Sequence, residues 1–295
     1  MTAFPARELP LAHWYRDTAR ELPWRTPEFH RCYGAWGTLV SEFMLQQTPV
    51  NRVIPHLDAW LTRWPTPKDL ACATPADVLA QWANLGYPRR ALRLHRAAIE
   101  IVERHDGVVP RDVDALLALS GIGDYTARAV AVFAYGDRHP VVDTNTRRVL
   151  ARAVQGVVHP ASPSRRDLQL MSSLLPASEE ESALFNAAMM ELGAIVCTAR
   201  SPRCSECPLR SGCAWIAAGR PDTAGPVSRQ ARFEGSDRQA RGAVMRMLRE
   251  APDHRVPLSA VVPEWPDTAQ RDRAVDSLIA DGLAEADGEM LSLPR

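Results

Sequence analysis

The chain has 295 residues, and 46% of them are hydrophobic, so it is long enough for about two domains with buried cores. Its 35 basic residues balance its 35 acidic residues, which excludes a chain that binds nucleic acid through a large net charge. No apolar run approaches the ~18 residues of a membrane span, and the N-terminus lacks a signal-peptide core. We therefore expect a cytoplasmic protein with no membrane partner.

Helical periodicity and helix-stop residues dominate residues 1–225, which predicts an all-α body of about ten helices. Thr74-Pro75-Ala76-Asp77 illustrates the pattern, with an N-cap, a proline at the first helical position and an acid in the first turn. A loop-like linker is predicted over 219–237. Residues 238–295 then predict a helix over RQARGAVMRMLRE, a short helix over PLSAVVPEW, a helix over AQRDRAVDSLIADG and a β-prone end, which together favour a small winged-helix-like region.

Residues 116–130 (LLALSGIGDYTARAV) predict a helical hairpin. One helix ends near Ser120, Gly121-Ile122-Gly123 turns, and a second helix begins near Asp124. The glycines allow positive φ, and free amides at the second helix can bind a phosphate without a basic side chain. Such a turn is also common between ordinary helices, so a DNA-binding hairpin and a turn that only connects two helices both remain open.

Asp143 follows an apolar pair and precedes a helix that is predicted to start near Thr144 or Asn145. It is either a simple N-cap or a carboxylate held at a cleft edge, where it can stabilise a cationic sugar. This segment alone does not decide between the two.

Four of the six cysteines lie within 17 residues, in the spacing Cys-x6-Cys-x2-Cys-x5-Cys. This density indicates a metal site in a reducing compartment rather than disulfides. One tight pair flanked by two single cysteines favours a [4Fe–4S] cluster over zinc, whose sites usually contain two Cys-x2-Cys pairs. We expect a structural cluster, since four thiolates leave no position for substrate, and a redox role stays open. The predicted ligands are Cys197, Cys204, Cys207 and Cys213.

These segments together resemble a known family. LSGIGDYTARAV, VVDTNTRRVLAR and FNAAMMELGAIVCTARSPRCSECP, in that order, resemble the helix-hairpin-helix DNA glycosylases with a [4Fe–4S] loop, both the endonuclease III type and the adenine-specific MutY type. VSEFMLQQTPVNRVIPHLDAW, LPWR and NLGYPRRALRLH resemble the MutY type. The resemblance covers about residues 8–215.

The resemblance implies an all-α glycosylase fold in two domains. A six-helix domain with the hairpin is expected over 29–136, and an iron–sulfur helical domain over 1–28 and 137–218. The Nudix-like domain with which MutY-type enzymes read 8-oxoguanine is not expected, because about 60 residues remain after the linker.

Residue by residue, the resemblance makes Glu42 the general acid that protonates the departing adenine, and Asp143 the carboxylate that stabilises the sugar cation. Asn145 and Tyr125 are implied to assist at the sugar and the scissile bond. The implied DNA contacts are Arg25, Gln46, Gln47, Thr48, Tyr87, Arg89, Gly121 and Gly123. Two positions depart from the pattern: Pro88 replaces the second aromatic of a Tyr-Tyr pair, and Ala187 replaces a longer polar residue of the adenine pocket.

The chemistry fits these roles. Adenine departs readily only as a neutral base, so a proton donor is needed. Burial raises the pKa of a carboxyl group, and Glu42 lies in an apolar segment (TLVSEFML). Asp143 must instead stay ionised. The target base must also leave the stack, which suits Tyr87 and Gln46 as wedge and gap filler.

The lysine content predicts the enzyme class within the family. Enzymes of the endonuclease III type use a hairpin lysine to form a Schiff base, but Tyr125 stands at that position and Lys68 is the only lysine of the chain. We therefore expect a monofunctional glycosylase, with water attacking directly or after a covalent step through Asp143.

The expected substrate is double-stranded DNA with adenine opposite 8-oxoguanine or guanine, and the expected state is a nucleoid-associated bacterial-type monomer. Two alternatives stay open: excision of another base, such as thymine from T:G pairs, and a non-catalytic iron–sulfur DNA-binding protein. The acidic balance of the tail favours a cap on the core or a protein partner over DNA contact.

Overall fold

The computed structural model describes residues 9–221 and 232–295. α-Helices dominate it, and the described strands lie near the C-terminus, which confirms the predicted fold class. None of the described helices combines the length and apolar character that crossing a bilayer requires. The chain divides into two compact units, described separately below. Of the described residues, the first comprises 9–38, 111–118 and 122–221, and the second comprises 39–110, 119–121 and 232–295.

α2 (Pro27–Leu45), kinked at Gly34, begins in the first unit and ends in the second. The domain boundaries expected from the resemblance stay a prediction. Much of the expected linker, 222–231, lies outside the described residues.

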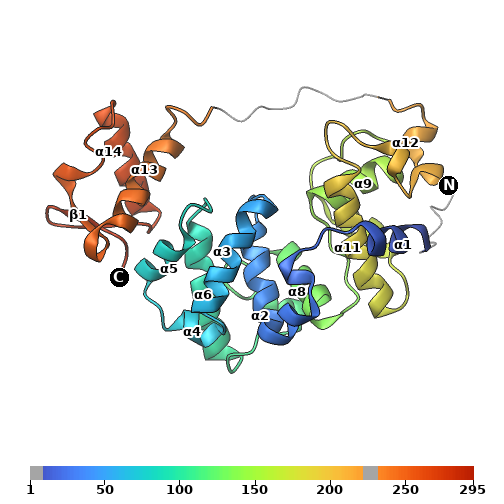
Figure 1. Cartoon of the computed structure of the whole chain (residues 1–295), viewed down its shortest axis with the longest axis horizontal. Helices are drawn as coiled ribbons and strands as arrows, with labels where there is room; N and C mark the ends of the chain where they lie inside the picture. Colours follow the sequence, from blue (N-terminus) through green and yellow to red (C-terminus); the bar gives the residue numbers. More distant parts are fainter. Residues whose placement is uncertain (1–8, 222–231) are drawn as a thin grey trace. The chain divides into compact units, whose positions relative to one another are not determined.

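The first unit is built around α11 (Glu179–Ile195), which packs side by side with α9 and is crossed by α1 (Figure 1). Ser178 caps α11 by accepting the Glu181 amide at 3.2 Å, and three glutamates in the first turn complement the helix dipole. The other helices of this unit are α1 (Leu9–Thr18), α7 (Val113–Leu117), α8 (Asp124–Tyr135), α9 (Thr144–Ala153), α10 (Arg165–Leu174) and α12 (Ala214–Ala217), with 3-10 turns η1 (Pro23–Arg25), η2 (Cys204–Glu206) and η3 (Arg210–Gly212).

The body of the second unit is organised by α6 (Arg89–Arg104), on which the short helices α4 and α5 pack (Figure 1). Thr74 caps α5 by accepting the Asp77 amide at 3.1 Å, as the sequence predicts. Trp60 and Trp82 are fully buried and meet edge to face with ring centroids 5.4 Å apart. The remaining helices of the body are α3 (Val50–Arg63), α4 (Pro67–Ala71) and α5 (Pro75–Trp82).

The C-terminal part pairs α13 (Asp237–Glu250) with α14 (Thr268–Ala280) and adds an antiparallel sheet in the order β1-β3-β2. Strands β1 (Arg255–Pro257), β2 (Glu285–Asp287) and β3 (Met290–Ser292) are three residues each, and the 3-10 turn η4 (Pro252–His254) precedes β1. This arrangement confirms a small winged-helix-like region.

The predicted middle helix of that region is wrong in detail. PLSAVVPEW forms only the 3-10 turn η5 (Leu258–Ala260), directly after β1. Pro257 is the last residue of β1, and Pro263 lies inside the predicted helix directly after β-branched Val261 and Val262, so helical backbone is disfavoured beyond Ala260.

Candidate active site and metal centre

Asp143 is both an N-cap and a firmly held carboxylate. One of its oxygens accepts the Thr146 amide at 2.6 Å, which caps α9. The other accepts the Asn145 side-chain amide at 2.8 Å. The two readings that the sequence left open are therefore compatible, because the cap fixes the carboxylate while leaving Asp143 partly exposed.

The segment that leads into Asp143 is anchored by Asn186 of α11. The fully buried Asn186 accepts the Val141 amide at 2.8 Å and donates to the His139 carbonyl at 3.0 Å. Tyr125, in the first turn of α8, packs against the small apolar cluster that contains Val141. The structure thus brings the hairpin tyrosine and the segment before Asp143 together.

Arg148 connects this carboxylate site to the cysteine loop. Its guanidinium donates to the Asn145 side-chain oxygen at 2.8 Å, the Gly193 carbonyl at 2.6 Å and the Cys197 carbonyl at 2.7 Å. Gly193 lies so close to α9 that an added Cβ would be 2.7 Å from the Asn145 Cβ. α9, α11 and the start of the loop therefore form one hydrogen-bonded assembly.

The four predicted ligands line one shared pocket, together with apolar side chains such as Val149, Leu192 and Trp215. Among the described residues, no three His, Cys, Asp or Glu side chains are arranged to hold a single ion. Thiols distributed around a shared apolar cavity are the arrangement that a multinuclear cluster requires. Burial raises the pKa of the Cys207 thiol to about 11, and a bound metal would favour its thiolate form.

Arg152 of α9 holds the start of the cysteine loop through its side chain. Its side chain is buried, 2% exposed, and donates to the Cys197 sulfur at 3.5 Å and to the carbonyls of Thr198 and Ala199 at 2.7 and 3.0 Å. Such donors to a ligand sulfur orient and tune iron–sulfur centres. The residues present therefore fit a cluster.

In the second unit, Glu42 is 6% exposed and lies among the buried residues Val40, Phe43 and Met44 of α2. The buried position agrees with the sequence expectation for a proton donor. α2 ends at Leu45, and Gln46, Gln47 and Thr48 follow directly. Gln47 has φ of 55° and Tyr87 has φ of 50°, both in the left-handed region, and Tyr87 is half exposed.

The hairpin turn uses its two glycines differently. Gly121 has φ of 77°, and an added Cβ would lie 2.7 Å from the Arg93 Cβ. Gly123 has φ of −101° and so does not use the positive φ that a glycine allows, and an added Cβ would meet no described atom beyond its chain neighbours within 4 Å. Glu100 fixes the turn by accepting the Ser120 amide at 2.7 Å.

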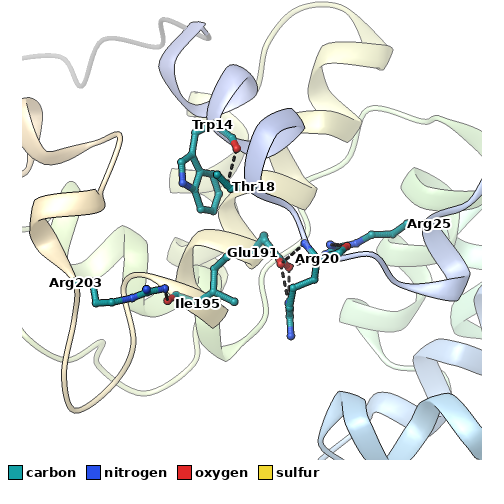
Figure 2. A network of polar contacts seen from close by, with 7 residues as sticks. All are labelled: Trp14, Thr18, Arg20, Arg25, Glu191, Ile195 and Arg203. Atoms are coloured by element: carbon teal, nitrogen blue, oxygen red, sulfur yellow. Dashed lines mark hydrogen bonds and ion pairs between the residues drawn. The ribbon is translucent and has the colours of Figure 1, made fainter.

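Of the arginines implied to bind DNA, Arg89 is exposed at the start of α6. Arg25 has an internal role in the structure. It donates to Glu191 at 2.8 Å and to the Arg20 carbonyl at 3.1 Å, and Arg20 donates to the same carboxylate (Figure 2). The DNA contact of Arg25 stays a prediction.

Comparison with known proteins agrees with these features. Residues 40–170 match the HhH-GPD superfamily of base excision DNA repair proteins, and residues 197–213 match the iron–sulfur binding domain of endonuclease III. An adenine DNA glycosylase of Mycolicibacterium smegmatis is 55% identical over 94% of this chain and 93% of that protein. This chain belongs to the adenine DNA glycosylase family.

Other members of the family include an adenine DNA glycosylase of Mycobacterium tuberculosis, 52% identical over 92% of this chain and 88% of that protein. The human adenine DNA glycosylase is 42% identical over 69% of this chain and 38% of its own length. Among solved structures, a thermostable thymine-DNA glycosylase aligns with a TM-score of 0.66 at 24% identity, over 73% of this chain and 97% of that one. A trapped endonuclease III–DNA covalent intermediate gives 0.60 at 22% identity, over 72% and 94%. These structures establish the fold.

The family membership confirms three sequence predictions. The protein is a DNA glycosylase that hydrolyses N-glycosyl bonds, it belongs to the adenine-specific type, and its cysteine loop binds a [4Fe–4S] cluster. Sequence reasoning missed Arg90, Arg148 and Asn186. All three stand inside the motifs that carry the resemblance, but only their contacts reveal what they hold.

Proposed function

We propose that this enzyme removes adenine mispaired with 8-oxoguanine or guanine in double-stranded DNA, as a monofunctional glycosylase that works as a monomer at chromosomal DNA. Glu42 is the general acid and Asp143 stabilises the sugar cation. The observation that carries the proposal is the Asp143 carboxylate, held by the Asn145 side chain on one oxygen and by the α9 amide of Thr146 on the other. A carboxylate fixed by two donors is preorganised for a developing positive charge.

The proposed reaction proceeds by proton transfer and bond cleavage. Glu42 gives its proton to a ring nitrogen of adenine, the C1′–N bond breaks, and its electron pair leaves with the neutral base. Asp143 then stabilises the positive charge at C1′. A water molecule adds there, directly or after a covalent step through Asp143, and gives its proton to the Glu42 carboxylate. The cluster supplies no step of this chemistry, and its cysteines hold the surrounding loop.

The assignment as a monofunctional glycosylase, without Schiff-base strand cleavage, is supported by the residues available as nucleophiles. Tyr125 occupies the hairpin position at which a Schiff-base enzyme needs an amine, and Lys68 is exposed on α4. Efficient strand cleavage at the excised site without added base or heat would contradict this part of the proposal.

DNA contact by the hairpin is supported by Gly123. Its extended backbone accepts any residue, and the described protein leaves open space where a Cβ would lie. A glycine there is therefore explained by close approach of a ligand backbone, and free amides at the start of α8 suit a phosphate. The winged-helix-like part serves as a cap or as the site of a protein partner.

The test is excision kinetics on duplexes containing A:8-oxoguanine, A:G, A:C, A:T and T:G. The proposal expects the fastest excision from A:8-oxoguanine and A:G, and Glu42→Gln is expected to retain DNA binding while losing turnover. Excision from A:8-oxoguanine no faster than from A:T contradicts the mispair assignment. Excision of thymine from T:G in preference to adenine favours the other base specificity, and an inactive wild-type holoprotein favours a non-catalytic binding protein.

A further inference from the structure

Arg90, in the first turn of α6, has its charged group enclosed by backbone. The residue is 6% exposed, and its two terminal nitrogens donate to five acceptors. Nη1 donates to the carbonyls of Phe43 at 2.8 Å, Met44 at 3.0 Å and Gln46, whereas Nη2 donates to the Thr48 hydroxyl at 2.8 Å and the Gly86 carbonyl at 2.9 Å.

These acceptors come from two separate segments. Phe43 and Met44 belong to the last turn of α2, whose carbonyls lack partners within the helix, so Arg90 satisfies the end of the helix that carries Glu42. Gly86 immediately precedes Tyr87, the proposed wedge. One guanidinium therefore ties the segment after α2 to the segment before α6, and it also lies 5.1 Å from the Trp82 ring centroid and 5.6 Å from that of Tyr87.

Both segments are strained. Gln47 and Tyr87 adopt φ of 55° and 50°, a region that is unfavourable for residues other than glycine and persists only where surrounding contacts impose it. The Arg90 contacts flank both residues: Gln46 and Thr48 enclose Gln47, and Gly86 precedes Tyr87. Arg90 therefore contacts residues next to both left-handed positions.

We propose that Arg90 is a positioning residue for base extrusion, which holds the Gln46–Thr48 and Gly86–Tyr87 segments in the strained form that enters the duplex. The inference rests on the proposed function, in which these segments face the mispair. Only arginine suits the task, because its planar fork serves several acceptors at once whereas lysine offers one compact ammonium. Burial lowers the pKa of Arg90 to about 10, so the guanidinium stays charged at neutral pH.

The experiment compares Arg90→Lys with the wild-type holoenzyme on a duplex with A opposite 8-oxoguanine and 2-aminopurine beside the target adenine. The fluorescence increase of 2-aminopurine on binding measures unstacking, and single-turnover excision measures chemistry. Arg90→Lys is expected to lose most of the fluorescence increase and at least tenfold in excision rate. The matched control is Arg138→Lys, which makes the same change in an arginine that donates to the carbonyls of Pro176 and Leu175 in the first unit, and it is expected to keep both signals.

A second pair of variants tests the same contact with smaller changes of side chain. Thr48→Ser keeps the hydroxyl that accepts from Arg90, and Thr48→Val removes it while keeping the shape. Thr48→Val is expected to lower the fluorescence increase and to slow excision about threefold relative to Thr48→Ser. This pair decides the question if Arg90→Lys does not fold.

Two results overturn the inference: a full fluorescence increase with Arg90→Lys, or identical behaviour of the two Thr48 variants. These results differ from failure of the proposed function. If the proposed function is wrong, the wild-type enzyme itself does not excise adenine from the same duplex.

Discussion

The side-chain amide of Asn145 donates a hydrogen bond of 2.8 Å to the Asp143 carboxylate, and the other end of the same amide accepts from Arg148 at 2.8 Å. Asn145 can therefore present its donor to Asp143 in only one orientation, because the Arg148 guanidinium accepts nothing and must face the Asn145 oxygen. Arg148, which contacts the iron–sulfur loop, thus fixes the orientation of Asn145 and, through Asn145, that of the proposed catalytic carboxylate.

Replacing Asn145 should slow excision without preventing DNA binding. Asn145→Ala removes one charge-assisted hydrogen bond to Asp143, which is worth about 1.5–3 kcal/mol and corresponds to roughly a 10- to 100-fold slower step if it acts in the transition state. Single-turnover excision and a binding titration separate the two effects. Thr144→Ala, an exposed neighbour in the same helical turn, is the control, and equal rates for both variants would exclude this role for Asn145.

Replacing Arg148 should affect the cluster and the chemistry together. Arg148→Met removes the donors to the Cys197 carbonyl, the Gly193 carbonyl and Asn145. We expect less iron bound per chain and excision at least tenfold slower. Arg147→Met is the matched control, since Arg147 lies next in the same helix but pairs with Asp167 at 3.0 Å. Iron content, visible absorbance and single-turnover excision are measured for both variants. An Arg148→Met variant with the iron content and excision rate of wild type would contradict the prediction.

Close packing of α11 against α9 predicts a steric effect at Gly193. Gly193→Ala would place a Cβ 2.7 Å from both the Asn145 Cβ and its carbonyl oxygen, and backbone cannot give way cheaply. We expect destabilisation of about 1–3 kcal/mol, as for other overpacked sites, and slower excision because Asn145 moves. Gly242→Ala in α13, where no described atom outside the helix backbone lies within 4 Å, should instead leave the melting temperature unchanged or raise it slightly. Equal melting temperatures for the two variants would contradict the prediction.

Local rules predicted those features that depend on neighbouring residues. The caps at Thr74 and Asp143 follow from residue types at fixed spacing, and the structure confirms both. The role of Arg90 does not follow in this way, because its acceptors lie up to 47 residues away and become visible only when α6 meets the end of α2. The same holds for Asn186, which is 45 residues from Val141. A buried polar residue inside an apolar helix face is a signal of such contacts, but it does not identify the partner.

The prediction for PLSAVVPEW failed for a different reason. Only Leu258–Ala260 forms a helical turn, and Val262, with φ of 39°, departs from helical backbone directly before Pro263. A proline disfavours helical backbone at the residue before it, so a local signal inside the segment outweighed its helical pattern.

The carboxylate of Glu191 makes stability depend on pH. Glu191 is 1% exposed; burial raises the pKa of this carboxyl, but the hydrogen bonds from Arg20 and Arg25 outweigh burial and hold the pKa at about 2 (Figure 2). Because the folded-state pKa lies below the ordinary value of about 4.3, the stabilisation is fully present above that value. It is lost as the pH falls toward 2.

Glu191→Gln keeps the shape but removes the charge that both arginines face. We expect it to lower the free energy of unfolding by about 2–3 kcal/mol at pH 7. The difference from wild type should shrink between pH 4 and pH 2, because wild type then becomes neutral at this position as well. Urea unfolding of both proteins across this range provides the measurement. Asp287→Asn is the control, since Asp287 is 75% exposed in its pair with Arg255 and exposed pairs contribute little. A constant difference between wild type and Glu191→Gln from pH 7 to pH 2 would show that the Glu191 charge does not stabilise the fold.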